Sequence, residues 1–367
     1  MKEILLAGAG KIGEMIVNLL TATGGYQVTV IDRSIEQLER LPASPLLKTR
    51  QLDITDPAAL AEAMSGKFAV LSAAPYSVTS HIAMAARKAR VHYLDLTEDV
   101  ATTRLVKTLA ADATTAFIPQ CGLAPGFISI VAHDLARRFE RLDTVRLRVG
   151  ALPQFPSNAL NYNLTWSTDG VINEYIQPCE AIVNGELREV PPLEELEEFS
   201  LDGVRYEAFN TSGGLGTLCD TLKGKVRMLN YRTVRYPGHR DIMKALIHDL
   251  QLGSRPEVLK DILEHAIPGT LQDVVLVFVT VSGYRQGRLL QESYASKIYG
   301  ADVGGKPCSA IQITTASGIC AVLDLLAQGK LPASGFVRQE DIPLDLFLAN
   351  RFGAAYAQSP VPGLKAA

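Results

Sequence analysis

Residues 1–33, MKEILLAGAGKIGEMIVNLLTATGGYQVTVIDR, decide the fold of the first part of the chain. An apolar run stops at the string Gly8-Ala9-Gly10-Lys11-Ile12-Gly13, and apolar residues then recur at helical spacing, which predicts a strand, a tight turn and a helix. In such a turn the first glycine permits the bend, the second lets a pyrophosphate approach, and the third lets helix and strand pack closely. The string therefore predicts a dinucleotide site on the helix N-terminus.

The strand that follows this helix, YQVTVID, ends in Asp32. A carboxylate at that position is placed to accept hydrogen bonds from an adenosine ribose and repels a 2′-phosphate, which favours NAD over NADP. Arg33 keeps NADP as the less favoured alternative. The competing interpretation of the glycine string is a turn in an α/β domain that binds no cofactor.

Strand-like and helix-like segments keep alternating to about residue 120, which predicts a doubly wound parallel sheet of the Rossmann type. In such a sheet, ligands lie outside the carboxyl ends of the strands. Asp53 and Ile54 close the third strand and are expected near the adenine. The fourth strand closes in Ala73, Ala74 and Pro75, which leave room for the ribose and the nicotinamide.

After about residue 141, the segments TVRLRVGAL, LNYNLTW, EAIVNG and KVRMLNYRTVRY are rich in Val, Tyr and Thr. The turn SGYRQGR joins two further runs as a hairpin, so we expect a second, α+β domain built on an antiparallel sheet. The apolar helix in SAIQITTASGICAVLDLLAQG, stopped by Gly329, is expected to pack back on the first domain. The predicted domains are residues 1–125 with about 308–367, and residues 126–307.

Composition narrows the possible partners. The chain is 47% hydrophobic and 20% charged with a net charge of −3, which gives no electrostatic case for binding nucleic acid or an anionic membrane. Five cysteines form no CxxC pair, and the histidines lack metal-ligand spacing, so we expect reduced thiols and no metal. The apolar run before Gly8 is too short for a secretion signal, and no stretch approaches a membrane span, which makes the cytoplasm the expected compartment.

The corner PQCGLAPGF, residues 119–127, is expected at the carboxyl end of the sixth strand. Its small side chains suit a backbone that passes close to the nicotinamide side of the cofactor, with Leu123 beside it; the alternative is a plain loop. Cys121 is a candidate proton donor or acceptor, or else a small buried filler.

Two other residues are candidates for proton transfer. Asp95 ends the fifth strand in YLDLTED and is expected inside the crevice, although acids at such junctions often cap helices. His239 follows Arg235 and Tyr236 in RTVRYPGHRD, a loop that could bind a carboxylate and an amine or could be a solvated basic turn. Trp166, in NYNLTWSTDGVINEY with Tyr175, is either a wall of the substrate pocket or part of an aromatic core.

The strings GAGKIG, AAPY, YLDLTED, CGLAPGF, TWSTDG, TSGGLGTL and RYPGH together resemble the saccharopine dehydrogenase-like oxidoreductases, and most closely their lysine 6-dehydrogenase branch. The resemblance implies a Rossmann domain completed by C-terminal helices, a second domain that supports dimers, and oxidation of a carbon–nitrogen bond by a nicotinamide cofactor. It also implies two groups of site residues. The substrate amine would lie beside Tyr76, Asp95 and Cys121, and the substrate carboxylate beside Trp166, Ser167 and Arg235. A histidine at position 239 favours the lysine branch.

These observations predict an NAD-dependent enzyme that oxidises L-lysine at the ε-carbon to 2-aminoadipate 6-semialdehyde. The first alternative is a dehydrogenase for a secondary amine of the saccharopine or carboxynorspermidine type. The second is an NAD-binding sensor without turnover. The proton carrier stays open among Asp95, Cys121 and His239. A homodimer that pairs the Val- and Tyr-rich sheets is expected.

Overall fold

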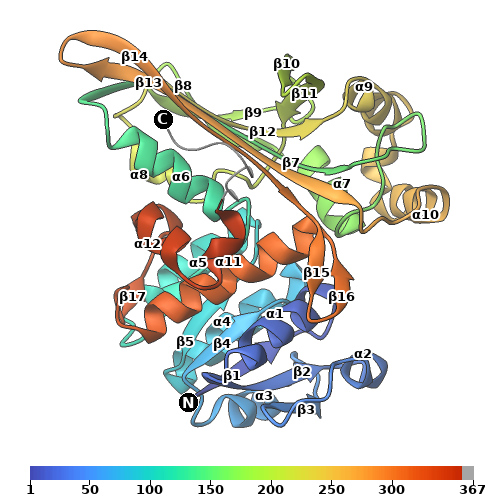
Figure 1. The fold of residues 1–367 in the computed structure, drawn as a ribbon, viewed down its shortest axis with the longest axis vertical. Helices are drawn as coiled ribbons and strands as arrows, with labels where there is room; N and C mark the ends of the chain where they lie inside the picture. Colours follow the sequence, from blue (N-terminus) through green and yellow to red (C-terminus); the bar gives the residue numbers. More distant parts are fainter. Residues whose placement is uncertain (358–367) are drawn as a thin grey trace.

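The computed structural model describes residues 1–357, and Figure 1 shows two layers of the molecule, one above the other. The lower layer contains a seven-stranded sheet in the order β17-β6-β5-β4-β1-β2-β3, and all of its strand pairs are parallel. Its strands are β1 (Lys2–Ala7), β2 (Tyr26–Asp32), β3 (Leu47–Gln51), β4 (Ala69–Ser72), β5 (His92–Asp95), β6 (Ala116–Ile118) and β17 (Gly335–Phe336). The strand order reverses between β1 and β4, which is where ligands bind in open α/β sheets. The predicted doubly wound fold is confirmed.

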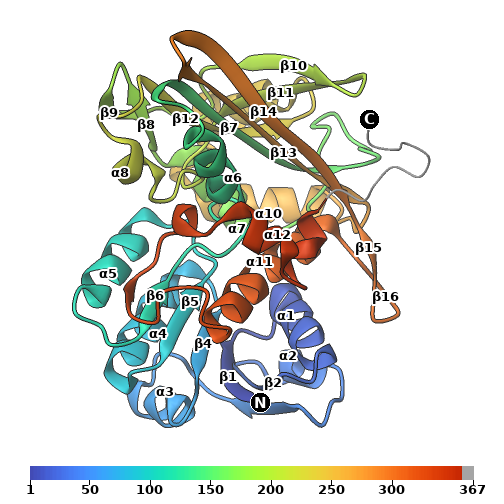
Figure 2. The same cartoon turned by 60° about the vertical axis from the view of Figure 1, so that its left-hand side comes forward.

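Helices cover both faces of this sheet because alternate residues of its strands point to opposite sides. Ile4 and Leu6 of β1 share one core with Ile16, while Leu5 shares the other core with Leu60. The helices are α1 (Lys11–Ala22), α2 (Ile35–Glu39), α3 (Pro57–Met64), α4 (Tyr76–Ala89), α5 (Val100–Ala110) and α11 (Ala310–Ala327). α11 lies against α1, as both ribbon views show, so a helix from late in the chain helps to cover the first sheet (Figures 1 and 2).

The upper layer contains an eight-stranded sheet with the path β10-β11-β12-β7-β13-β14, and β8 and β9 extend it beside β12. The strands are β7 (Arg141–Pro153), β8 (Cys179–Val183), β9 (Glu186–Val190), β10 (Glu197–Leu201), β11 (Val204–Asn210), β12 (Met228–Arg235), β13 (Asp273–Arg285) and β14 (Arg288–Tyr299). The expected antiparallel pairing holds except that β7 and β12 run parallel, so the sheet is mixed. The predicted hairpin is present, and Gln286 and Gly287 both have positive φ, as a two-residue turn of this kind requires.

Short helices pack around the second sheet and after it. They are α6 (Phe127–Ala136), α7 (Thr168–Ile176), α8 (Leu218–Leu222), α9 (His239–Lys244), η1 (Ala245–Asp249), η2 (Leu252–Ser254), α10 (Pro256–Ala266), η3 (Gln339–Asp341), α12 (Leu344–Ala349) and η4 (Gly353–Tyr356). The segment LNYNLTW, expected as a strand, forms only an isolated bridge between Leu164 and Gly269. Its side chains pack instead in an aromatic and aliphatic core with α7 and α10.

The chain returns to the first sheet through the small hairpin of β15 (Ala301–Val303) and β16 (Lys306–Cys308), followed by α11. The carboxylate of Asp273 on β13 accepts hydrogen bonds from the backbone N–H groups of Ala310 and Ile311, which fixes the start of α11 to the second sheet. α11 is long and apolar enough to cross a membrane by composition, contrary to our expectation that no stretch would be. However, 78% of it is buried inside the structure, as in a core helix. We call residues 1–125 and 308–357 the first domain and residues 126–307 the second.

Candidate functional site

The glycine turn after β1 has the geometry that an anion site needs. Gly8 has φ +106°, and a Cβ there would lie 2.7 Å from the carbonyl oxygen of Ala73, while a Cβ on Gly13 would overlap the carbonyl oxygen of Gly8. By contrast, a Cβ on Gly10 would have no atom within 4 Å, so space is open above it. α1 begins at Lys11 without a side-chain cap, which leaves the N–H groups of its first turn, Ile12 included, available to a phosphate.

Asp32 lies at the end of β2, next to this turn. One carboxylate oxygen accepts from Ala9 N at 2.8 Å and the other from Ser34 N at 2.9 Å, so the side chain holds the glycine turn and the next loop together. Each oxygen keeps a lone pair for a further donor. The neighbouring Arg33 is exposed.

The other expected cofactor residues follow β3 and β4. Asp53 is exposed and accepts from the backbone and hydroxyl of Thr55, and these hydrogen bonds lower its pKa. Ile54 is half-buried against the core below. Pro75 precedes α4, which also begins without a side-chain cap, and Tyr76 at its start is 44% exposed. Together with Ala73 and Ala74, which are half-buried, these residues follow the carboxyl end of β4.

Asp95 differs from its expected position on the wall of the crevice because its side chain is fully buried. Its carboxylate accepts from the Tyr93 hydroxyl at 2.7 Å and from the backbone N–H groups of Thr97 and Gln120. Burial raises the pKa of Asp95 to about 6, against these hydrogen bonds. Asp95 therefore fastens β5 to the corner after β6, and an effect of this carboxyl group on a substrate would have to pass through neighbouring residues.

The corner PQCGLAPGF is also buried, contrary to the expectation that it faces the cofactor. Cys121 is 1% exposed, its Sγ contacts Ile118 O and Gln339 Nε2, and burial raises its pKa. Leu123 is 5% exposed and lies in the main core. A Cβ on Gly318 of α11 would lie 2.5 Å from the carbonyl oxygen of Cys121, so the corner is pressed against α11. Close packing therefore accounts for its small residues, and Cys121 fits the alternative of a buried filler.

Arg235, Tyr175 and His239 form a hydrogen-bonded chain inside the second domain, and none of the three is more than 2% exposed. Arg235 Nε donates to the Tyr175 hydroxyl at 2.9 Å, which lies 3.0 Å from His239 Nε2. His239 Nδ1 lies 2.9 Å from the carbonyl oxygen of Leu160, which can only accept. Nδ1 therefore carries the hydrogen, and Nε2 accepts from Tyr175.

Burial, followed by the charge of Arg235, lowers the pKa of His239 to about 3, so the ring is neutral. This histidine was expected as a proton carrier on a loop. Both of its ring nitrogens are instead engaged with protein groups, which makes it a residue that positions Tyr175 and, through it, Arg235.

Several polar groups of Arg235 and of residues 162–165 lack well-formed hydrogen bonds. The guanidinium donates through Nε to Tyr175 and through Nη1 to the Val234 carbonyl, and no hydrogen bond of Nη2 is found within residues 1–357. The guanidinium carbon lies 5.1 Å from the centre of the Tyr162 ring. The Tyr162 hydroxyl, Asn163 Oδ1 and Thr165 Oγ1 are buried without a hydrogen-bond partner. Such atoms are rare in folded proteins and indicate a place for water or a polar ligand.

Trp166 and Ser167 support α7, the helix that carries Tyr175. Ser167 Oγ accepts from Gly170 N at 3.2 Å and so caps the helix. Trp166 is half-buried, and its indole packs against Gly170, where any Cβ would overlap the ring. Both residues therefore build the second domain's side of the site, as core rather than as an exposed pocket wall.

Two glutamates that the sequence analysis did not select meet where the domains meet. Glu98 follows β5 in the first domain, and Glu174 belongs to α7 in the second. A Cβ on Gly213 would lie 3.0 Å from the Cβ of Glu98, and the adjacent Ser212 N donates to the carbonyl oxygen of Glu174 at 3.1 Å. Burial, followed by the charge of Glu98, raises the pKa of Glu174 to about 8, while Arg235 acts in the opposite direction.

Comparison with known proteins identifies the family. Residues 4–117 match the model of the saccharopine dehydrogenase NADP binding domain, and residues 122–350 match that of the saccharopine dehydrogenase C-terminal domain. The chain belongs to the saccharopine dehydrogenase family. The predicted resemblance is thereby confirmed at the level of the family.

Two relatives resemble this chain at low sequence identity. It is 24% identical over 177 residues to the saccharopine dehydrogenase [NADP(+), L-glutamate-forming] of Saccharomyces cerevisiae, a match that covers 47% of this chain and 40% of that protein. It is 23% identical to the mitochondrial alpha-aminoadipic semialdehyde synthase of Mus musculus, over 82% of this chain and 33% of that protein. The chain thus spans well under half the length of the curated relatives it matches.

A solved structure shows that the two-domain fold is shared. The apo histidine-tagged saccharopine dehydrogenase (L-Glu forming) from Saccharomyces cerevisiae superposes with a TM-score of 0.75 at 16% identity, and covers 93% of this chain and 94% of that one. Both the parallel sheet and the second sheet are therefore those of the saccharopine dehydrogenase family.

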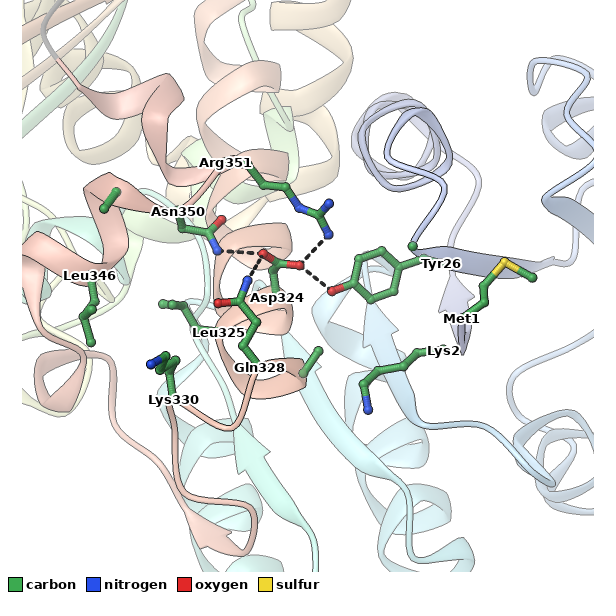
Figure 3. A pocket seen from close by; sticks show the side chains of 13 residues that line it. Met1, Lys2, Tyr26, Asp324, Leu325, Gln328, Lys330, Leu346, Asn350 and Arg351 are labelled. Carbon is green, nitrogen blue, oxygen red and sulfur yellow. Dashed lines mark hydrogen bonds and ion pairs between the residues drawn. The ribbon is translucent and has the colours of Figure 1, made fainter.

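A cavity of about 590 Å³ lies at the opposite edge of the first sheet from this site, where β1 and β2 begin (Figure 3). In its wall the carboxylate of Asp324 on α11 accepts from Tyr26, Gln328, Asn350 and Arg351. With its acceptor positions taken by protein groups, Asp324 joins α11 to β2 and to the segment after α12. Among residues 1–357, no cluster of three His, Cys, Asp or Glu side chains is arranged to hold a metal ion.

Proposed function

We propose that the chain oxidises a carbon–nitrogen bond of a small amino acid with a nicotinamide dinucleotide, and that its substrate is L-lysine, attacked at the ε-carbon. The observation that supports this most directly is Arg235, a buried guanidinium that lies over the Tyr162 ring and has no hydrogen bond from Nη2 within residues 1–357. A substrate carboxylate would satisfy these donors in a charge-assisted pair.

The number of buried arginines left without a protein carboxylate favours lysine over saccharopine as the substrate. Two arginines are fully buried in the described chain, and the other one, Arg148, is paired with Glu197 at 2.7 Å. One buried guanidinium therefore remains for a substrate, which matches the single carboxylate of lysine. Saccharopine carries several carboxylates and would meet Glu98 and Glu174 in the same region, where like charges repel. What supports saccharopine is the activity for which the relatives are named.

The first domain fits a dinucleotide, and we propose NAD as the preferred one. The uncapped start of α1 and the open space above Gly10 suit the pyrophosphate, and Asp32 suits an unphosphorylated ribose. The exposed Arg33 and the NADP named in the family model support NADP as the alternative. When bound, the nicotinamide supplies the acceptor for the hydride that leaves the ε-carbon.

In the overall reaction, lysine, the oxidised dinucleotide and water yield 2-aminoadipate 6-semialdehyde, ammonium, the reduced dinucleotide and one proton. Arg235 fixes the α-carboxylate at a set distance, so that the distal amine is the one that reaches the crevice. Tyr175 and His239 hold the guanidinium in that orientation.

The test is a substrate panel of lysine, saccharopine and a diamine with its semialdehyde partner, each assayed with NAD⁺ and NADP⁺ by the absorbance of the reduced cofactor. We expect turnover with lysine and NAD⁺. Turnover with saccharopine alone would support the second candidate. Cofactor binding without any turnover would support a sensor.

Replacing Arg235 with lysine tests the carboxylate anchor. Arg235→Lys should raise KM for lysine by roughly tenfold or more, because a charge-assisted hydrogen bond contributes about 1.5–3 kcal/mol. The control is Arg227→Lys, at an exposed pair with Asp143 on the second domain, which should leave KM unchanged. An unchanged KM in Arg235→Lys would contradict the anchor.

A further inference from the structure

We propose that Glu174, with Glu98 facing it across the domain junction, binds the substrate's distal amine and accepts its proton before the carbon–nitrogen bond is oxidised. The inference rests on the proposed function, because it concerns the same site that Arg235 lines.

The two carboxyl groups come together because the domains do. Glu98 lies between β5 and α5, at the carboxyl edge of the first sheet, where a parallel sheet binds its ligands. Glu174 lies on α7, one residue before Tyr175. The dipeptide Ser212-Gly213 touches both: Ser212 N donates to the backbone of Glu174, and Gly213 packs against Glu98. The pair therefore stands between the cofactor crevice and the carboxylate anchor.

The carboxylate of Glu174 is short of partners. The residue is 7% exposed, and no hydrogen bond to its side chain is found in the described part of the chain. A buried carboxylate without a partner is costly to a folded protein and is retained where a ligand supplies the missing donor.

An independent observation points to a polar ligand in the same space. Tyr162 is 3% exposed, and its hydroxyl makes no well-formed hydrogen bond, although Thr165 and Trp166 lie close enough to lower its pKa. Burial raises the pKa of Tyr162; the charge of Arg235 acts to lower it and that of Glu174 to raise it, so this hydroxyl lies within reach of both charges. An amino acid bound between the two charges would bring its carboxylate to Arg235 and its amine to Glu174, and the orphaned hydroxyl would lie beside it.

Glu174 is the group in this cluster that titrates near neutral pH. The titratable groups that face it are Glu98, Arg235, Tyr162, Tyr175, Tyr231 and Cys179. Burial raises the pKa values of the tyrosines and of Cys179, so they stay neutral; Arg235 stays charged, and His239 behind Tyr175 is neutral. Burial also raises the pKa of Glu98, and the charge of Glu98 in turn raises the pKa of Glu174.

The proton transfer balances with the overall reaction. The nitrogen–hydrogen bond of the ε-ammonium breaks, and an oxygen–hydrogen bond forms on Glu174. The nitrogen lone pair that is freed then forms the carbon–nitrogen double bond as the hydride leaves the ε-carbon for the dinucleotide. The proton on Glu174 passes to water and is the one proton that the reaction releases.

The experiment compares the wild-type chain with Glu174→Gln, Glu98→Gln and the control Glu180→Gln, each checked for a cooperative thermal transition. Glu180 also lies at the domain junction, where it pairs with Arg104, and no hydrogen bond or ion pair with Arg235 is found within residues 1–357. The measurement is kcat/KM for lysine against pH. Wild type should rise with pH and show an inflection near pH 8. Glu174→Gln should lower kcat/KM by roughly 100-fold or more and lose that inflection, as expected for removal of a general base.

Glu98→Gln should move the inflection to lower pH because a like charge is removed, and Glu180→Gln should leave the profile unchanged. A wild-type profile in Glu174→Gln would overturn the inference while lysine oxidation itself stands. If wild type oxidises saccharopine instead, the proposed substrate fails, and the same profiles measured with saccharopine decide the inference.

Calorimetry provides a readout that does not depend on turnover. Lysine is titrated into the NAD-saturated chain near pH 8 in two buffers of different ionisation enthalpy. Wild type should show a buffer-dependent enthalpy, because binding the amine changes the protonation of the carboxyl pair, and Glu174→Gln should lose it. An equal buffer dependence in both chains would contradict the role of Glu174.

Discussion

The surroundings of a residue can decide its protonation state and its orientation, as they do for Arg235, Tyr175 and His239. The ring of His239 is neutral because it is buried beside a permanent positive charge, and its two nitrogens complete the hydrogen bonding of Leu160 and Tyr175. A histidine that can neither gain nor pass on a proton near neutral pH can still hold an arginine in one orientation.

This arrangement predicts how stability depends on pH. The pKa of His239 is about 3 in the folded chain and near 6.5 in the unfolded chain. The stability that the neutral ring contributes is therefore fully present above pH 6.5 and is lost as pH falls toward 3. The slope in that window is on the order of 1.4 kcal/mol per pH unit. Denaturant unfolding between pH 7 and pH 4 should show a shallower loss for His239→Gln than for wild type. Parallel curves for the two chains would refute this account.

At the same scale, the sequence predicted what depends on neighbours in the chain and missed what depends on distant ones. Gly8, Gly10 and Asp32 were found from their spacing because turn and strand bring them together locally. Glu98 lies within the string YLDLTED and Glu174 within NYNLTWSTDGVINEY, but neither string marks its glutamate, and only the packing of Ser212-Gly213 between the domains makes them a pair. Asp95 was selected correctly as a strand end, but its burial is set by the tertiary contacts of Tyr93 and Gln120, which spacing does not reveal.

Among the elements, α11 and the corner after β6 depend on each other. The helix can approach the corner because Gly318 has no side chain, and the corner can turn because Gly126 has φ +134°. Two segments far apart in the sequence thus determine one packed junction.

Gly318→Ala should therefore destabilise the protein, although alanine normally favours a helix by about 1 kcal/mol over glycine. The added methyl group would lie 2.5 Å from the carbonyl oxygen of Cys121, so either the helix or the corner must move. Overpacking of this kind costs about 1–3 kcal/mol. Urea unfolding should show a lower midpoint for the variant; a higher midpoint would mean that the junction is looser than described.

Elements were predicted well where pairing is local and poorly where it is not. The hairpin of β13 and β14 was recognised because its turn and both strands adjoin in the sequence. The parallel pair of β7 and β12 joins segments about eighty residues apart, with other strands between them, and nothing in either segment encodes that choice. The run LNYNLTW has strand-like composition, but its aromatic side chains are taken up by the core around α7 and α10.

For the whole molecule, Asp324 holds together parts of the first domain that come from both ends of the described chain. Its carboxylate joins α11 to Tyr26 of β2 and to Asn350 and Arg351, as Figure 3 shows. Asp324 is 2% exposed and Arg351 is 46% exposed, so water reaches the arginine end of this network.

Asp324→Ala should lower the free energy of unfolding by about 3 kcal/mol, because it leaves the buried hydroxyl of Tyr26 and the buried amide of Asn350 without their acceptor. The matched control is Asp112→Ala, whose carboxylate pairs with Arg87 while 85% exposed and should change stability by less than about 1 kcal/mol. An equal loss of unfolding free energy in the two variants would show that the hydrogen bonds of Asp324 stabilise the protein no more than an exposed ion pair does.

Other expectations for the whole molecule stay predictions. β14 is an edge strand, and Leu289 and Tyr299 at its ends are exposed, which is compatible with the expected homodimer. Sedimentation of the full chain would measure its oligomeric state directly. The cytoplasmic location also stays a prediction.

The late return of the chain to its first sheet has a consequence for biosynthesis. On the ribosome, β1 to β6 emerge early, yet α11 and β17 follow only after the entire second domain has been made. At typical translation rates of about 5–20 residues per second, one apolar face of the nascent sheet would wait on the order of ten seconds for its covering helix. During that interval it would be a natural target for chaperones, and a nascent chain stalled within the second domain should be especially prone to aggregate.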